Sequence, residues 1–214
     1  MALITAPQAR EKIPSLTGTG EDTLLDTMIA AAGVAFARYC GYPAASVGGN
    51  PTMEAATYTR YMDGPRPSAT TPEGRALEAR CLTLEVWPVN SITSIEDDPT
   101  WDFDGASYLV ASTDYTLRDG NRGLVVLKST AAHGQWSSID GAIKVVYSGG
   151  FSAGPATLKE LCKHAVRHAY DLRATQGKTN LSQGGVNVGL RDEDYLPALV
   201  RQGLDNFRLP RSLL

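Results

Sequence analysis

Apolar residues recur at helical spacing near both ends of this 214-residue chain. Over residues 21–41 the spacing predicts one long helix, with acidic residues in its first turn and Gly41 as its left-handed stop. Thr5 can cap a shorter helix before it, and a last short helix is predicted over 192–207. A second long helix is predicted to begin at Pro155. Its apolar stripe consists of Leu158, Leu161, Cys162, Ala165, Ala169 and Leu172.

Between the helical segments the hydrophobic period changes to two. Short β-branched or aromatic runs separated by turn residues predict strands there, and residues 118–123 predict a hairpin loop between two of them. The predicted strands are 56–62, 81–86, 91–96, 114–117, 124–128 and 142–148. The fold class is therefore α+β, a helical core made by the N-terminal and C-terminal helices with a central antiparallel sheet or sandwich as an excursion.

The changes of period also predict the domain organisation. N-terminal helices are expected over 1–52, a β region over 53–149, and C-terminal helices that pack with the N-terminal ones over 150–206. A tail, 207–214, follows. The polar, glycine-rich segment 176–190 within the third region is expected to be mobile or to form a loose hairpin.

The composition of the chain argues against several classes of function. A net charge of −3 and a pI near 5.6 argue against a protein that holds nucleic acid through bulk positive charge. Cys40, Cys81 and Cys162 are far apart and odd in number, which favours a reducing compartment over a disulfide framework or zinc cluster. The chain has no apolar run of 18 residues and no secretory signal, so we expect a soluble protein made in the cytoplasm.

One motif suggests a serine hydrolase. Residues 150–154 read Gly-Phe-Ser-Ala-Gly, which fits the G-x-S-x-G turn that exposes a nucleophile between a strand and a helix. The hydrolase order of serine, acid and histidine fails after Ser152, because Glu160 would lie between the serine and His164 on one helix. His133 precedes the serine and could serve only in another topology. A glycine-rich turn from strand to helix is the favoured interpretation.

Three further motifs match known sites incompletely. The sequence around Gly177-Lys178-Thr179 lacks the first glycine of a phosphate-binding loop, where Leu172 stands, and follows a helix. His164 and His168 are spaced like a metal-binding pair, but no third ligand is apparent. The acidic segment 96–105 aligns poorly with a calcium loop and favours a hairpin loop. We therefore expect no cofactor, no metal site and no catalytic residue.

A basic row runs along the second long helix. Lys159, Lys163 and Arg167 are spaced i, i+4 and i+8, so they share one helix face. Such a row is typical of a solvated face opposite the apolar stripe. The alternative is a contact surface for an acidic partner, or for a nucleic-acid backbone in a channel.

The order of segments over nearly the whole chain resembles the head-tail connector (adaptor) proteins of long-tailed bacteriophages and of phage-derived gene transfer agents. The most specific pieces are "WPVNSITSI", the turn "IKVVYSGGF" with the proline and long helix after it, and the terminal helix with its Arg-rich and Leu-rich tail. The resemblance implies a structural virion protein without catalytic activity. It further implies a ring, usually of twelve copies, in the neck between head and tail, and passage of the genomic DNA without sequence-specific binding.

The resemblance also implies partners and contact residues. The ring would bind the portal protein on one side and a neck, stopper or tail-completion protein on the other, with no membrane involved. The part that reaches the portal would be the C-terminal helix end and tail. By position its residues are Asp205, Asn206, Phe207, Arg208, Leu209, Pro210, Arg211, Leu213 and Leu214.

Two other functions remain open on the sequence. One is a non-viral binding module with a β core and helical flanks, which would be monomeric and bind a small molecule or peptide. The other is a hydrolase that uses Ser152 with an unrecognised base.

Overall fold

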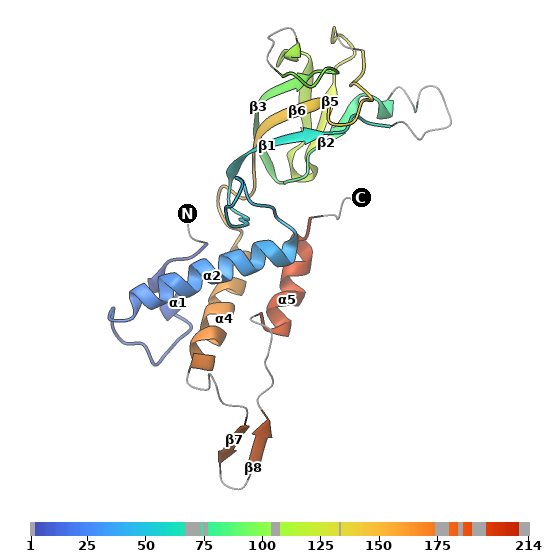
Figure 1. Cartoon of the computed structure of the whole chain (residues 1–214). Helices are drawn as coiled ribbons and strands as arrows, with labels where there is room; N and C mark the ends of the chain where they lie inside the picture. The colour runs from blue at the N-terminus through green and yellow to red at the C-terminus, as the bar shows by residue number, and fades with distance from the viewer. Residues whose placement is uncertain are drawn as a thin grey trace. The chain divides into compact units, whose positions relative to one another are not determined.

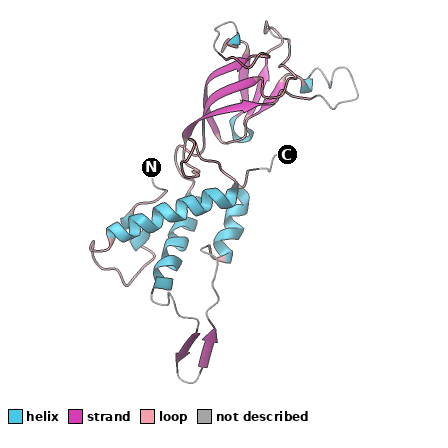
Figure 2. Cartoon of the chain, viewed as in Figure 1, coloured by secondary structure: helices cyan, strands magenta, loops and turns pink. Residues whose placement is uncertain are grey.

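The structure, a computed structural model, describes residues 3–66, 74, 77–103, 108–132, 134–173, 180–183, 186–189 and 196–209, with 180–183 and 186–189 described by their backbone alone. The chain divides into two compact units (Figure 1). The helical unit contains the described residues of Met1–Pro43, Pro51–Met53 and Ala153–Arg211, and the β unit those of Ala44–Asn50 and Glu54–Ser152. Figure 2 shows helices concentrated in the first and strands in the second, so the α+β class is confirmed.

The helical unit is built on two long helices whose ends agree with the sequence signals. Helix α1 (Ala6–Arg10) begins after Thr5, whose backbone N–H donates a hydrogen bond to Gln8 Oε1 at 2.9 Å. Helix α2 (Asp22–Cys40) ends at Gly41, which has the left-handed φ of 82°. Helix α4 (Ala156–Leu172) begins after Pro155. Because α2 packs against α1 and α4, the N-terminal and C-terminal helices share one core.

The buried face of α4 is broader than the predicted stripe. Four of the six predicted positions are buried, whereas Ala169 and Leu172 are only half-buried and Val166 and Tyr170 are buried in addition. The reason is that α4 packs against α5 (Ala198–Leu204) as well as α2, and two neighbours cover a wider arc of a helix than one. The last helix is shorter than predicted, since it begins only after Pro197 and continues into the 3₁₀ turn η4 (Asp205–Phe207).

The glycine-rich segment forms a hairpin in its described part. Strand β7 (Asn180–Gln183) pairs antiparallel with β8 (Val186–Gly189), and Gln183 is the register partner of Val186. Of the two expectations for this segment, the hairpin is therefore confirmed for these eight residues.

The β unit contains two three-stranded antiparallel sheets. One has the order β1-β6-β3 and the other β2-β5-β4 (Figure 1). The strands are β1 (Ala56–Met62), β2 (Cys81–Thr83), β3 (Val89–Asp97), β4 (Tyr115–Asp119), β5 (Leu124–Leu127) and β6 (Ile143–Gly149). All six strands were predicted, although the predicted second strand, 81–86, ends at Thr83. The predicted hairpin loop at 118–123 contains the 3₁₀ turn η2 (Gly120–Arg122).

The strands alternate between core and surface, as a two-residue period requires. In β6 the side chains of Ile143, Val145 and Tyr147 are fully buried, and those of the residues between them are half-buried. The Tyr147 hydroxyl accepts a hydrogen bond from the backbone N–H of Val86 at 3.1 Å, and burial raises its pKa to about 12. The polar end of this core tyrosine is thus satisfied by backbone.

Candidate partner-binding surfaces

The C-terminal segment is anchored on the end of α2. Tyr39 donates its hydroxyl to Asp205 Oδ1 at 2.9 Å, and the Arg208 guanidinium lies 5.1 Å from the centre of the Tyr39 ring, over its face. Arg208 is also within 3.5 Å of Asp205 Oδ1. The backbone N–H of Leu209 donates to the Cys40 carbonyl at 2.8 Å. The hydrogen bond to Asp205 raises the pKa of the Tyr39 phenol above its usual value.

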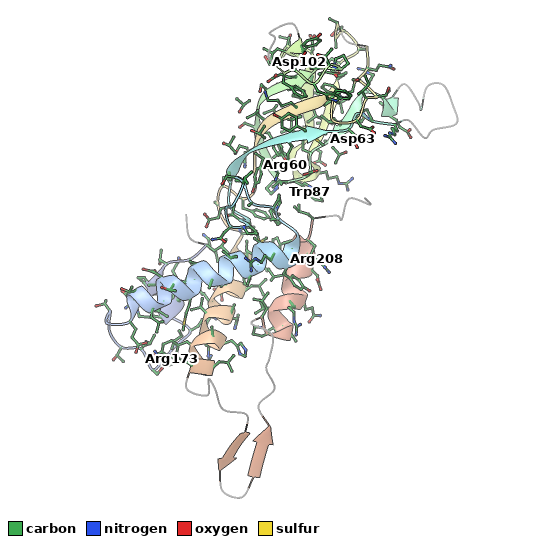
Figure 3. All side chains as sticks on the ribbon, in the orientation of Figure 1. Arg60, Asp63, Trp87, Asp102, Arg173 and Arg208 are labelled. Carbon is green, nitrogen blue, oxygen red and sulfur yellow. The ribbon has the colours of Figure 1, made fainter. Side chains whose placement is uncertain are left out.

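These contacts divide the predicted portal-contact residues into two groups. Asp205, Arg208 and Leu209 bind within the helical unit, and Arg208 is labelled in Figure 3. Asn206 is exposed and Phe207 is half-buried. Pro210, Arg211, Leu213 and Leu214 lie outside the described residues. The part that Tyr39 takes could not be predicted from the sequence, because Tyr39 lies 166 positions before Asp205.

The three cations of the basic row have different surroundings. The Lys163 side chain is only 12% exposed, and its Nζ lies 2.7 Å from Glu11 Oε2 and 3.0 Å from Glu160 Oε1. Arg167 is 51% exposed and pairs with Asp171 at 3.5 Å. Lys159 is half-buried. Lys163 therefore joins α1 to α4, whereas Arg167 remains accessible on the helix surface.

Further ion pairs surround Lys163 in the helical unit. Lys12 lies 3.2 Å from Glu160. At the other end of α4, Arg173, labelled in Figure 3, lies 2.7 Å from Glu21 and stacks over the Tyr170 ring at 4.1 Å. The hydrogen bond from Arg173 is the first cause of a lowered pKa of Glu21. Pairs between α4 and the N-terminal segment thus hold the two halves of this unit together.

Ser152 is exposed at the predicted glycine-rich turn. The turn contains Gly150, with a φ of 97°, whose N–H donates to the Pro88 carbonyl at 2.8 Å. Ser152 itself lacks a positive φ, so its backbone does not carry the strain of a nucleophile elbow. The interpretation as a turn from strand to helix is confirmed, since β6 ends at Gly149 and α4 begins at Ala156.

The other motifs form no ligand-binding cluster that the structure describes. His164 and His168 both lie half-buried on α4, and within the described ranges no three His, Cys, Asp or Glu residues could hold a metal ion together. His133, Gly177, Lys178, Thr179, Asp104 and Gly105 lie outside the described residues.

The three cysteines are free thiols. Cys40 and Cys162 lie in the core of the helical unit at 1% and 0% exposure, and Cys81 in β2 is half-buried. Burial raises the pKa of both Cys40 and Cys162 to about 12. No helix in the described part of the chain is both long enough and apolar enough to cross a membrane.

The fold is shared with a protein of known assembly. A solved structure described as the "Neck of empty GTA particle computed with C6 symmetry" contains a chain that superposes with a TM-score of 0.53, covering 100% of this chain and 96% of the other. The two sequences are 15% identical, so the similarity is one of fold. No family model and no curated protein matches the sequence.

Proposed function

We propose that this chain is a structural protein of the neck of a phage-like particle. It forms a ring that joins the capsid portal to the tail and leaves a channel for DNA. The observation that carries the proposal is a fold shared over the whole chain with a component of a particle neck. The order of sequence segments, which resembles head-tail connectors, supports the same function independently of the superposition.

Ring formation is supported by the architecture of the subunit. A closed ring needs two unlike surfaces on each subunit that fit head to tail. A helical unit and a β unit supply unlike surfaces on one chain. The related neck structure has C6 symmetry, which rings of six and of twelve copies both satisfy. We propose twelve copies, and a net charge of −3 suits a channel that DNA must traverse without adhering.

We propose that the C-terminal tail binds the portal. Arg208 and Leu209 fix the base of the tail on Tyr39 and Cys40, so the anchored part of the tail reaches Leu209. The residues that follow are Pro210, Arg211, Ser212, Leu213 and Leu214, which combine a cation with apolar side chains. A short segment of this kind gains affinity when its leucines are buried on a partner, which offsets the entropy lost on ordering.

The test is to delete Pro210 to Leu214 and keep the anchor residues. We expect rings of wild-type size in negative-stain micrographs, an unchanged circular dichroism spectrum, and loss of binding to the purified portal ring. The matched control is Arg208→Lys, which keeps the charge and residues 210–214 and should keep portal binding within a few-fold. Portal binding that survives the deletion would overturn the assignment of the tail, and a wild-type chain that stays monomeric beside the portal would overturn the proposed function.

A further inference from the structure

Exposed apolar side chains gather at one end of the β unit. Tyr61 is 59% exposed, Trp101 58% and Ile139 39%, and each comes from a different loop or strand end next to the start of β6. Phe103 is half-buried beside them. We call these four residues, with Asp63, Asp102 and Asp140, the three-loop surface. A cluster of large exposed apolar residues on a folded domain is typical of an interaction site.

The loops hold each other in place through contacts between their side chains and backbone. The Tyr61 and Phe103 rings meet edge to face with their centres 5.1 Å apart. Trp101 donates its indole N–H to the Asp140 carbonyl at 2.9 Å, and Asp63 accepts the N–H of Gly141 at 2.9 Å. The four apolar residues therefore belong to one continuous structure.

A buried carboxylate fixes the loop that carries Trp101 and Phe103. Asp98 has 0% exposure, and its two oxygens accept hydrogen bonds from the N–H groups of Thr100 and Phe103, both at 2.8 Å, and from the Thr100 hydroxyl at 2.6 Å. Burial alone would raise the pKa of Asp98, but these hydrogen bonds outweigh it and lower the pKa. The loop thus has one defined conformation.

The backbone of this loop is strained at its two aromatic residues. Trp101 has a φ of 62° and Phe103 a φ of 48°, in the left-handed region that bulky residues rarely occupy. Glycine or asparagine would be less strained at both positions. The hydrogen bond of Trp101 and the ring contact of Phe103 offset part of this strain, but they do not require the Trp101 ring to face solvent. A rigid aromatic contact gains affinity because little entropy is lost on binding.

The charges around the aromatic centre are mainly acidic. Asp63 and Asp102, both labelled in Figure 3, are exposed, and Asp140 pairs with Arg66. Lys144 Nζ also lies 5.6 Å from the centre of the Phe103 ring, and it pairs with Glu96 at 3.0 Å. Four carboxylates, those of Asp63, Asp102, Asp140 and Glu96, therefore outnumber the two cations at this surface, Arg66 and Lys144. Such a surface complements a partner that is apolar at its centre and basic at its rim.

We propose that the three-loop surface docks a second structural protein of the neck, with an apolar centre and a basic rim, on the tail side of the ring. This inference rests on the proposed function, and it assigns a partner to a surface that the portal does not contact. Trp101 and Tyr61 are its central contacts, in line with the preference of interface hot spots for tryptophan and tyrosine. Asp63 and Asp102 contribute charge complementarity at the rim.

The experiment measures binding of the purified full-length ring to two probes, the portal ring and the purified tail-side neck protein of the same particle. The variants are Trp101→Ser, Tyr61→Ser and Asp102→Lys. The matched control is Val47→Ser, since Val47 is the fully exposed apolar residue of the β unit outside this surface. Tyr61→Ser removes one ring contact with Phe103 but leaves the hydrogen bonds of Asp98 and Trp101 in place, so it remains informative if Trp101→Ser disturbs the loop.

We expect Trp101→Ser and Tyr61→Ser each to weaken tail-side binding at least about tenfold, and Val47→Ser to change it less than twofold. Asp102→Lys should slow association and reduce its dependence on salt. Portal binding should stay unchanged in all four.

Unchanged tail-side binding in both aromatic variants overturns the inference while the proposed function stands. Loss of ring formation in those variants also overturns it, since the occupant would then be a second copy of this chain. A wild-type chain that forms no ring and binds neither probe overturns the proposed function itself.

Discussion

Gly64 shows how closely two segments of the β unit approach each other. A Cβ built at this position would lie 1.4 Å from the carbonyl oxygen of Ser137 and 3.1 Å from the Cα of Ser138. Both contacts are with backbone, which cannot rotate away as a side chain can. Since Ser137 also donates its N–H to the buried Asp97, the segment opposite Gly64 is held in place.

At this scale we predict that Gly64→Ala destabilises the protein by about 3 kcal/mol or more, because the added methyl group forces two backbones apart. The matched control is Gly134→Ala, where a Cβ meets no atom within 4 Å. The control should change the free energy of unfolding by no more than about 0.5 kcal/mol. Urea denaturation of both variants measures the difference, and equal midpoints would contradict the close approach.

At the scale of elements, agreement between sequence and structure follows the strength of the local pattern. The run 56–62 is rich in threonine and tyrosine, which favour strands, and β1 has those bounds. Gly41 ends α2 because its left-handed conformation is a local property that the sequence displays. The buried face of α4 was only partly predictable, since it depends on α5, which a distant segment supplies.

The candidate surfaces were less predictable than the elements for the same reason. Periodicity showed that Lys163 and Arg167 share a helix face, but not that Glu11, 152 positions away, would pair with Lys163. The three-loop surface was missed altogether. The acidic segment 96–105 was predicted to be a hairpin loop between strands, but Glu96 and Asp97 belong to β3, and the described loop runs from Asp98 to Phe103. Nothing local revealed that Asp98 is buried and that Trp101 is exposed.

The ion pairs of α4 lead to a prediction about helix packing. Lys163→Met should lower the melting temperature more than Arg167→Met, because it leaves Glu11 and Glu160 without their shared cation, whereas the exposed pair of Arg167 contributes no more than about 0.5 kcal/mol. Lys163, and then Lys12, lower the pKa of Glu160. The stability that the lowered pKa of Glu160 contributes to the folded protein is therefore present above the unfolded pKa of about 4.3. It is lost as the pH falls below that value. Thermal unfolding at pH 7 and pH 3 tests this, and a difference that widens at pH 3 would contradict it.

At the scale of the whole molecule, the β unit is an insertion into the helical unit. The chain leaves the helices after Pro43, returns for Pro51–Met53, and returns finally at Ala153. The helical core therefore needs segments from both halves of the sequence, while the β unit has a core of its own. A subunit divided in this way can vary the surface of one unit without rebuilding the core of the other.

Ser152 lies where the chain returns to the helices. Its substitution distinguishes a structural protein from a hydrolase. We expect Ser152→Ala to form rings of wild-type size and to bind the portal with wild-type affinity. We also expect no labelling of the wild-type protein by a fluorophosphonate probe, since Ser152 lacks the strained backbone of a nucleophile elbow. Labelling of the wild-type chain that disappears in Ser152→Ala would establish an enzymatic activity instead.

Cys40 and Cys162 give the helical core a property that matters after assembly. Oxidants and disulfides react with a thiolate, and a pKa of about 12 leaves roughly one such group in 10⁵ ionised at pH 7. In the particle neck that we propose for this chain, these two sulfur atoms would therefore stay in a form that peroxide hardly attacks. Such a neck would need neither a reducing environment to protect the two thiols nor a covalent cross-link between them.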